Sequence, residues 1–275
     1  MDRVAAVQMA SGPNLDANLL EAGRLIKTAV EGDARLVVLP ENFAMMGLQD
    51  KDILQYRELP GDGPIQAFIR KQCRRHQIWI VGGTIPLHCG VDSKTAAACM
   101  LFDDQGEIQA RYDKIHLFDV TLVASGESYN ESATIRSGNE LVVADSPFGR
   151  IGLTVCYDLR FPELFRALLD QGAEIITLPA AFTALTGKAH WESLLRARAI
   201  ENLVYLVASA QGGYHLNGRE THGHSMIIDP WGSIKGERAH GAGVVVADID
   251  RQRLEEIRKN FPSIHNRRLT CQMSA

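Results

Sequence analysis

The stretch ARLVVLPENF, residues 34–43, has a counterpart in AEIITLPAAF, residues 173–182, and this pair decides the predicted fold. Short apolar runs bounded by polar or turn-forming residues are typical of strands buried inside a sheet. Two further pairs of segments follow the same order in both halves of the chain: VAAVQM (4–9) with IGLTVC (151–156), and LFDDQGEI (101–108) with IIDPWGSI (227–234). The chain is therefore predicted to contain an internal repeat, the alternative being a chance likeness of apolar strands.

Each half is predicted to run strand, helix, strand, helix, and then strands that include an Asp-x-x-Gly hairpin. Pro64 and Pro162 suit the first turn of a helix. The predicted helices cover roughly Asp16 to Val30, Pro64 to His76, Pro162 to Asp170, His190 to Asn202 and Arg251 to Lys259. Two sheets with helices on one face each can bury their bare faces only against each other, which predicts a four-layer α-β-β-α sandwich with a pseudo-twofold repeat.

Composition and charge limit the number of domains, the partners and the cellular location that we expect. The 275 residues are 45% hydrophobic, and no linker or low-complexity tract divides them, so we expect one domain over 1–275 with an irregular C-terminal tail from about residue 261. The net charge of −4 comes from scattered side chains, which argues against nucleic acid and anionic membrane as partners. Five cysteines without a CxxC pair, and no signal peptide or membrane-spanning stretch, predict a cytoplasmic protein.

Three reactive side chains stand at the edges of strand-like segments. Cys156 follows the apolar run Ile151 to Val155, Glu41 ends ARLVVLPEN, and Lys114 lies in ARYDKIHLF. A thiol is mostly protonated at neutral pH and needs a base or a nearby positive charge to become a nucleophile. Glu41 is the candidate base and Lys114 the candidate charge.

These three groups are sufficient for amide hydrolysis. Glu41 can take the proton of the Cys156 thiol, return it to the departing amine, and then activate water to hydrolyse the thioester. Lys114 and the backbone N–H of Tyr157 can hold the oxyanion. The alternative interpretations are that Cys156 is a small buried hydrophobic residue and that Glu41 and Lys114 form a structural ion pair.

The segments LPENF, YDKIHLFD and VCYDLRFPE resemble the Glu-Lys-Cys motifs of the nitrilase superfamily of carbon–nitrogen hydrolases, from VAAVQM to NRR. AFTALTGKAHWESLLRARAIEN and HGHSMIIDPWG resemble the branch that contains deaminated-glutathione amidases. The resemblance implies a cofactor-free thiol amidohydrolase that cleaves a non-peptide carboxamide of a small carboxylate-bearing molecule, with deaminated glutathione as a candidate. An ω-amidase acting on 2-oxoglutaramate and an N-carbamoyl amino-acid hydrolase are the alternatives within this chemistry.

The resemblance also assigns residues around the triad. Glu131, in GESYNESATIRSG, matches an additional glutamate that positions the substrate or the lysine, with Glu127 as its competitor. Residues 121–124, TLVA, replace a Pro-Gly turn of relatives. Arg160 is a candidate for pairing with a substrate carboxylate, and Phe182 and Thr186 are candidates for lining the pocket.

Other sites and other classes of protein are disfavoured. His222 and His224 have no third ligand at a recognisable spacing, so we predict no metal site, and Gly82-Gly83 lacks phosphate-loop spacing. A papain-like hydrolase with His116 as its base and a non-catalytic binding or scaffold protein are the competing hypotheses. The family further implies a homodimer or higher homo-oligomer, formed through the segment Arg160 to Asp170 and the helix with Trp191.

Overall fold

The computed structural model describes residues 2–123 and 126–270. Its helices are α1 (Leu15–Glu31), α2 (Pro64–His76), α3 (Pro162–Asp170), α4 (Ala184–Asn202) and α5 (Arg251–Asn260), with 3-10 turns η1 (Asp50–Tyr56), η2 (Glu131–Ala133), η3 (Cys156–Arg160) and η4 (Ser263–His265). None of the helices in this part of the chain is long and apolar enough to cross a bilayer.

Two sheets form the centre of the molecule. The first has the order β17 (Gly243–Ile249), β1 (Asp2–Gln8), β2 (Leu36–Val38), β3 (Trp79–Val81), β5 (Thr95–Phe102), β4 (Ile85–His88), and β6 (Ile108–Asp113) also pairs with β5. The second has the order β16 (Ile234–Arg238), β15 (Ser225–Ile228), β12 (Tyr205–Ala210), β11 (Ile175–Ala180), β10 (Ile151–Leu153), β9 (Val143–Ala144). Two small hairpins, β7 (Asp119–Leu122) with β8 (Glu127–Asn130) and β13 (Gly212–Tyr214) with β14 (Glu220–His222), lie outside these sheets.

The two sheets share one strand order. β1, β2 and β3 are parallel neighbours, as are β10, β11 and β12, and an antiparallel strand follows each set, β5 in one sheet and β15 in the other. The paired segments 34–43 and 173–182 contain β2 and β11, the second strand of each parallel set. The order of elements is that predicted from the repeated segments, and the pseudo-twofold relation itself stays a prediction.

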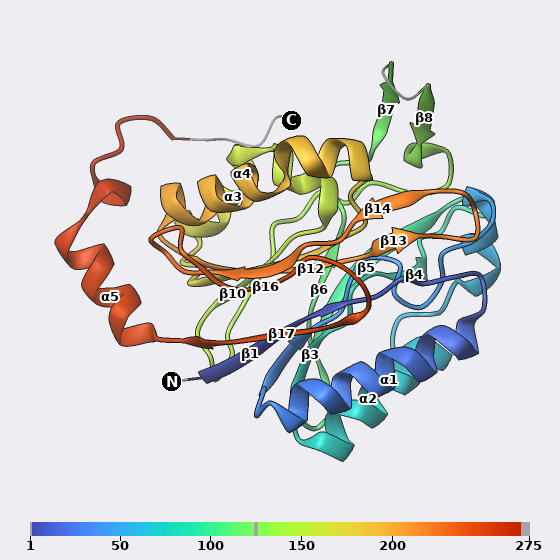
Figure 1. Ribbon diagram of the computed structural model, residues 1–275, viewed down its shortest axis with the longest axis horizontal. Coiled ribbons are helices and arrows are strands. Elements are labelled where there is room, and N and C mark those ends of the chain that lie inside the picture. Colours follow the sequence, from blue (N-terminus) through green and yellow to red (C-terminus); the bar gives the residue numbers. More distant parts are fainter. Residues whose placement is uncertain (1, 124–125, 271–275) are drawn as a thin grey trace.

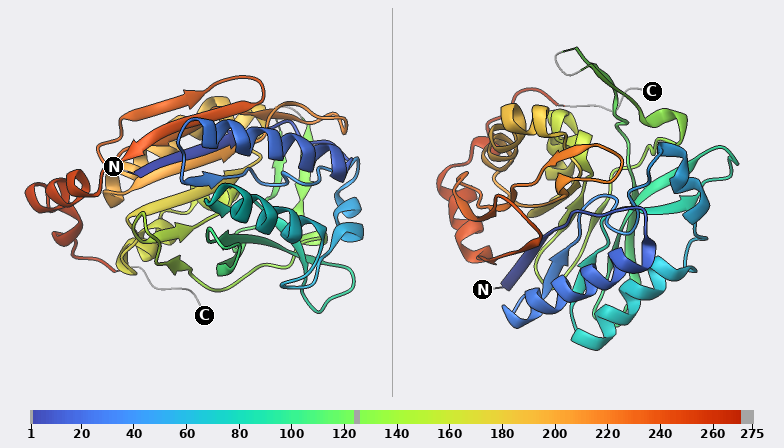
Figure 2. Two further views of the ribbon diagram at one scale, coloured as in Figure 1. Left: turned by 90° about the horizontal axis from the view of Figure 1, so that it is seen from below. Right: turned by 45° about the vertical axis from the view of Figure 1, so that its right-hand side comes forward.

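The layers follow from side-chain alternation along the strands. Val4 and Ala6 of β1 belong to the core cluster shared with the second sheet, whereas Ala5 and Val7 pack in a separate cluster with α1 and α2. Helices α1 and α2 cover one outer face, and α3 and α4 cover the other (Figures 1 and 2). The predicted four-layer α-β-β-α sandwich is confirmed.

Two predicted boundaries were wrong. Helix α4 begins at Ala184, six residues before the predicted His190, because the Thr183 hydroxyl accepts a hydrogen bond from the Thr186 amide and caps the helix there. The strand expected from Ile151 to Val155 ends at Leu153, since its last two residues already turn toward η3. Helices α2 and α3 have the predicted bounds.

Candidate active site

The three predicted reactive residues come from three strand ends. Glu41 lies beyond β2, Lys114 directly follows β6, and Cys156 opens η3 after β10. The Lys114 ammonium donates a hydrogen bond to Glu41 Oε1 over 2.8 Å, and all three side chains line one cleft. The sequence therefore located groups that the fold brings together from both sheets.

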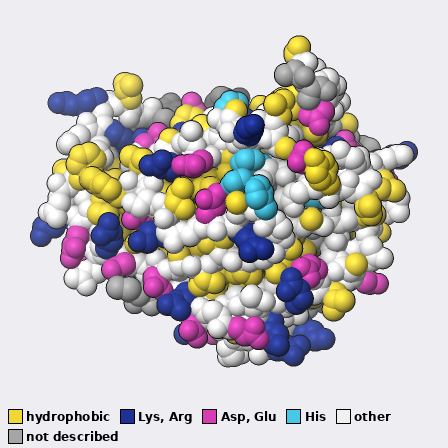
Figure 3. Space-filling view, viewed as in Figure 1, with side chains coloured by type: hydrophobic (Ala, Val, Ile, Leu, Met, Phe, Trp, Pro, Cys, Tyr) yellow, Lys and Arg dark blue, Asp and Glu magenta, His cyan; other side chains and the backbone are white. Residues whose placement is uncertain are grey.

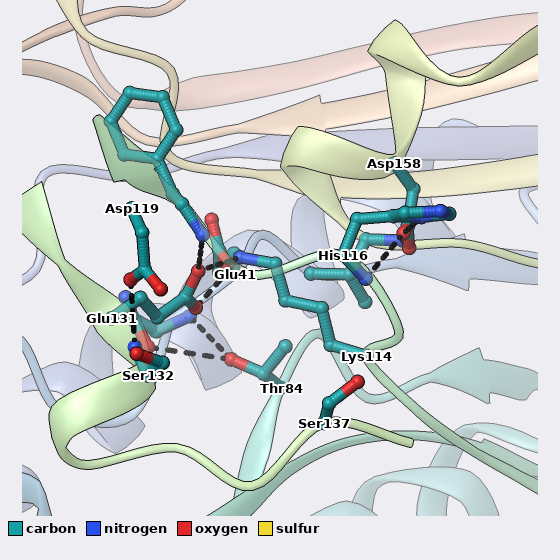
Figure 4. Close-up of polar contacts among 12 residues, drawn as sticks. Glu41, Thr84, Lys114, His116, Asp119, Glu131, Ser132, Ser137 and Asp158 are labelled. Atoms are coloured by element: carbon teal, nitrogen blue, oxygen red, sulfur yellow. Dashed lines mark hydrogen bonds and ion pairs between the residues drawn. The ribbon is translucent and has the colours of Figure 1, made fainter. Parts of the chain in front are cut away.

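Glu131 completes this cluster. Lys114 Nζ donates to its two carboxylate oxygens over 2.7 and 2.9 Å, and the Phe118 amide donates to Oε2 over 2.6 Å. Figure 4 shows Glu41 and Glu131 both directed toward the end of Lys114. Glu127 lies on β8, outside the described lining of the cleft, so the geometry favours Glu131 over its competitor as the glutamate beside the triad.

The site is nearly closed to water, which sets its electrostatics. Lys114 is 1% exposed, Glu41 5% and Cys156 8%. Burial and the neighbouring Glu41 raise the pKa of the Cys156 thiol well above its ordinary value. Burial alone would lower the pKa of Lys114, but the Glu131 and Glu41 carboxylates outweigh it and raise that pKa well above the usual range. Burial also raises the pKa of Glu131. The lysine is thus held as an ammonium, and the resting thiol is protonated at neutral pH.

Cys156 occupies a strained turn. Its φ is 48°, in the left-handed region, where a residue with a side chain is strained by about 1–3 kcal/mol and persists only because the surrounding structure holds it. The Val155 amide immediately before it donates to Asp158 Oδ2 over 2.8 Å, which closes the turn that presents the thiol.

Asp158 also joins this turn to the segment that carries the lysine. The Tyr112 hydroxyl donates to Oδ2 over 2.7 Å, while the His116 amide and Nδ1 lie 3.3 and 2.7 Å from Oδ1. Asp158 and Tyr112 are fully buried. Sequence reasoning missed both residues, although an Asp three positions after the end of a strand-like run was an available signal for a capped turn.

This contact also places His116, the base of the papain-like alternative. Its ring stacks on Phe161 with centroids 3.7 Å apart, and it is not among the described residues that line the cleft. Figure 4 shows His116 beside Asp158. His116 therefore belongs to the hydrogen-bond network of Asp158 beside the site. Glu41, in contrast, contacts Lys114 and lines the cleft together with Cys156.

Two glycines allow the strand ends to approach. A Cβ on Gly83, whose φ is 56°, would lie 2.1 Å from the Pro40 carbonyl oxygen, directly before Glu41. A Cβ on Gly138 would lie 2.1 Å from the Asp113 carbonyl oxygen, directly before Lys114. Any larger residue would displace the backbone that carries a site residue.

The predicted substrate residues line the same cleft. The Arg160 guanidinium lies 5.1 Å from the centre of the Phe182 ring, and Thr186 Oγ1 is 2.8 Å from Thr183 Oγ1. Tyr157 lines it too. Sequence reasoning missed a set of residues at the cleft that carries no motif: Asp50, Tyr129, Asn217 and Arg219. The TLVA segment forms part of β7 and the turn after it, and its last residue, 124, lies outside the described residues.

The histidines of β14 and the following turn lie elsewhere on the surface. The His222 and His224 rings stack 4.3 Å apart, His224 Nδ1 lies 2.5 Å from Glu237 Oε1, and Figure 3 shows histidines gathered on this face. Burial lowers the pKa of His222 to about 4. Within residues 2–123 and 126–270, no group of three or more potential ligands is arranged to hold a metal ion.

Comparisons with known proteins identify the family of the chain. The model of the carbon–nitrogen hydrolase family matches residues 3–259. The deaminated glutathione amidase of a Synechocystis strain is 45% identical over 266 residues, covering 96% of this chain and 97% of the relative, and that of Yersinia enterocolitica is 46% identical over 267 residues, covering 96% and 92%.

Solved structures give the same result. Nit3 of Saccharomyces cerevisiae, a member of branch 10 of the nitrilase superfamily, has a TM-score of 0.87 at 31% identity, covering 98% of this chain and 97% of that one. The NitFhit protein of C. elegans has a TM-score of 0.88 at 35% identity, covering 97% and 65%. The chain therefore belongs to the carbon–nitrogen hydrolase family and is an amidohydrolase of the nitrilase superfamily, as its three motifs predicted.

Proposed function

We propose that the enzyme hydrolyses the amide bond of deaminated glutathione through a thioester on Cys156. The observation that carries the chemistry is the buried Glu41–Lys114 ion pair, 2.8 Å long, in the cleft that Cys156 lines. The substrate is supported by relatives with that name at 45–46% identity over nearly the whole chain.

Acylation begins with a neutral thiol. Because the pKa of Cys156 is raised, the thiolate forms only as the sulfur attacks the amide carbon and Glu41 accepts the proton. The carbonyl electrons move to oxygen, and the Lys114 ammonium and the Tyr157 N–H stabilise the oxyanion. When the intermediate collapses, the C–N bond breaks, Glu41 returns the proton to the departing amine, and the acyl group stays on sulfur.

Deacylation reverses these roles. Glu41 takes a proton from water as the oxygen attacks the thioester carbon, and the C–S bond breaks. The proton then returns to Cys156, which regenerates the thiol and releases a carboxylic acid. Lys114 does not exchange protons in either step, because Glu131 and Glu41 hold it as an ammonium. Its role is electrostatic, and Glu131 fixes its position.

Three residues that line the cleft, Arg160, Phe182 and Thr186, are proposed to select the acyl group. Arg160 presents a planar guanidinium four residues after the nucleophile and is proposed to bind the carboxylate of the 2-oxo acid. Within residues 2–123 and 126–270, the polar side-chain partner of Arg160 is His190, whose Nδ1 lies 3.2 Å from Nη1, and no acidic side chain pairs with the guanidinium. Phe182, beneath the guanidinium, and Thr186 are proposed to line the acyl pocket.

Rapid-quench mass spectrometry tests this proposal. Deaminated glutathione and 2-oxoglutaramate share one acyl group, so both should add the same 2-oxoglutaryl mass to the peptide that contains Cys156. An N-carbamoyl amino acid would add a different mass. The Cys156→Ala variant should show no adduct, and the Cys89→Ala variant, which changes a half-buried cysteine outside the cleft lining, should label like the wild type. Absence of both adduct and released cysteinylglycine with the wild-type enzyme would refute the assignment.

Assembly and location extend the proposal. We expect a cytoplasmic homodimer that associates through the segment 160–170 and helix α4, and reduced Cys73 and Cys99, both buried, fit a reducing compartment. Light scattering coupled to size-exclusion chromatography measures the mass of the assembly, and a monomer at micromolar concentration would contradict the dimer.

A further inference from the structure

The cleft carries a second guanidinium that the proposed mechanism does not use, that of Arg219. Arg219 stands immediately before β14 and lines the same cleft as Cys156. Its backbone amide donates to Asn217 Oδ1 over 3.0 Å, and Asn217 Nδ2 donates to the Gly47 carbonyl over 2.9 Å. These bonds join the loop between β13 and β14 to the segment that follows Glu41, and so hold Arg219 in the wall of the cleft.

The guanidinium is oriented but not saturated. Nη2 donates to Asp50 Oδ1 over 2.5 Å, and the group lies 5.1 Å from the centre of the Tyr129 ring. A guanidinium has five N–H donors, and across residues 2–123 and 126–270 only this one side-chain hydrogen bond is formed by Arg219. Asp50 and Tyr129 also line the cleft. Pairing and stacking therefore fix the plane of the group and leave donors for a ligand.

We propose that Arg219 forms an outer subsite for a carboxylate carried by the leaving amine of the substrate. The inference rests on the proposed function, and it separates two substrates of that chemistry. Deaminated glutathione has one carboxylate on its 2-oxo acyl part and another at the end of its cysteinylglycine part. 2-Oxoglutaramate releases ammonia and lacks the second carboxylate.

In this proposal each of the two arginines binds one carboxylate of the substrate. Arg160 binds the carboxylate of the acyl group, which both substrates share. Arg219 binds the distal carboxylate, which an extended two-residue leaving group carries about 7 Å from the scissile nitrogen. A planar guanidinium suits a carboxylate because two parallel N–H donors meet its two oxygens. The enzyme should therefore prefer an amide of a carboxylate-bearing dipeptide over a primary amide.

The test compares wild-type enzyme and the Arg219→Gln variant on three substrates: deaminated glutathione, its C-terminal glycine carboxamide, and 2-oxoglutaramate. Because the Arg219 side chain is 37% exposed and shares its charge with Asp50, we expect a loss at the lower end for a charge-assisted contact. The variant should lose about tenfold in kcat/KM on deaminated glutathione, mainly through KM, and remain within about twofold of wild type on 2-oxoglutaramate.

The carboxamide substrate removes the distal carboxylate, as Arg219→Gln removes the guanidinium, and the two changes together form a double-mutant cycle. Wild-type enzyme should lose the same factor on it as the variant loses on the acid, and the variant should discriminate little between acid and carboxamide. The Arg238→Gln variant is the matched control, since Arg238 is an exposed β16 residue outside the lining of the cleft. Equal losses of Arg219→Gln on all three substrates, or no loss on any, would overturn the subsite while the proposed function stands. Wild-type enzyme that cleaves neither 2-oxo amide would overturn the proposed function and the subsite with it.

Discussion

Replacement of Asp158 by Asn should lower the free energy of unfolding and kcat, although Asp158 takes no part in the reaction itself. Asp158 receives four hydrogen bonds, two at each oxygen, from the Tyr112 hydroxyl, the Val155 amide and two nitrogens of His116. Asn has the same shape but only one acceptor oxygen, so one pair of these contacts must face an NH2 group.

The magnitude follows from which donors remain. If the NH2 group replaces Oδ2, the Val155 amide becomes a buried donor without an acceptor, at about 1–3 kcal/mol, while the Tyr112 hydroxyl can rotate to accept. If it replaces Oδ1, the His116 amide loses its acceptor at a similar cost. The loss of charge weakens the contacts that survive. We therefore expect the free energy of unfolding to fall by about 2–4 kcal/mol.

Activity should fall as well, because Asp158 joins the Cys156 turn to the Lys114 segment. We expect kcat to drop about tenfold or more, with a smaller change in KM, since the displaced groups act on the transition state. Denaturant unfolding and steady-state kinetics are the measurements. Asp145→Asn is the matched control, because Asp145 is 89% exposed and pairs with Arg150 at the surface, where such a pair contributes less than about 1 kcal/mol. Destabilisation below about 1 kcal/mol with unchanged kcat would refute the assignment of Asp158 as the positioning residue.

Three further outcomes are expected. Glu131→Gln removes a carboxylate that raises the pKa of Lys114, so the alkaline limb of the kcat–pH profile should move to lower pH. We also expect kcat to fall about 100-fold. An alkaline limb that does not move would contradict the ion pair between Glu131 and Lys114. Alkylation of Cys156 by iodoacetamide at pH 8 should be at least about tenfold slower than that of a free thiol and should rise with pH, because burial and a carboxylate raise the thiol pKa; mass spectrometry that finds equal rates would refute this. Gly138→Ala should lower the free energy of unfolding by about 2 kcal/mol or more, since the new methyl group meets a carbonyl oxygen 2.1 Å away, whereas Gly12→Ala, with its nearest atom at 3.8 Å, is the control that should change little.

Much of the fold was predictable because its signals are local. Apolar runs identify β2 and β11 wherever they lie, and a proline at a first helical turn marks α2 and α3. The start of α4 was not predictable from apolar spacing, because a threonine cap that also lines the cleft determines it. A cap is a single hydrogen bond, and its sequence signal is weaker than a repeated apolar pattern.

By itself the sequence determined which residues could react and the order of the strands that carry them, because nucleophile, carboxylate and ammonium each stand at the edge of a strand-like segment. Only the tertiary structure decided which glutamate contacts Lys114, that Asp158 ties the lysine segment to the cysteine turn, and that Arg219 reaches the cleft from the loop before β14. Such contacts join residues far apart in the chain. They depend on how the two sheets and their loops pack, which no local pattern records.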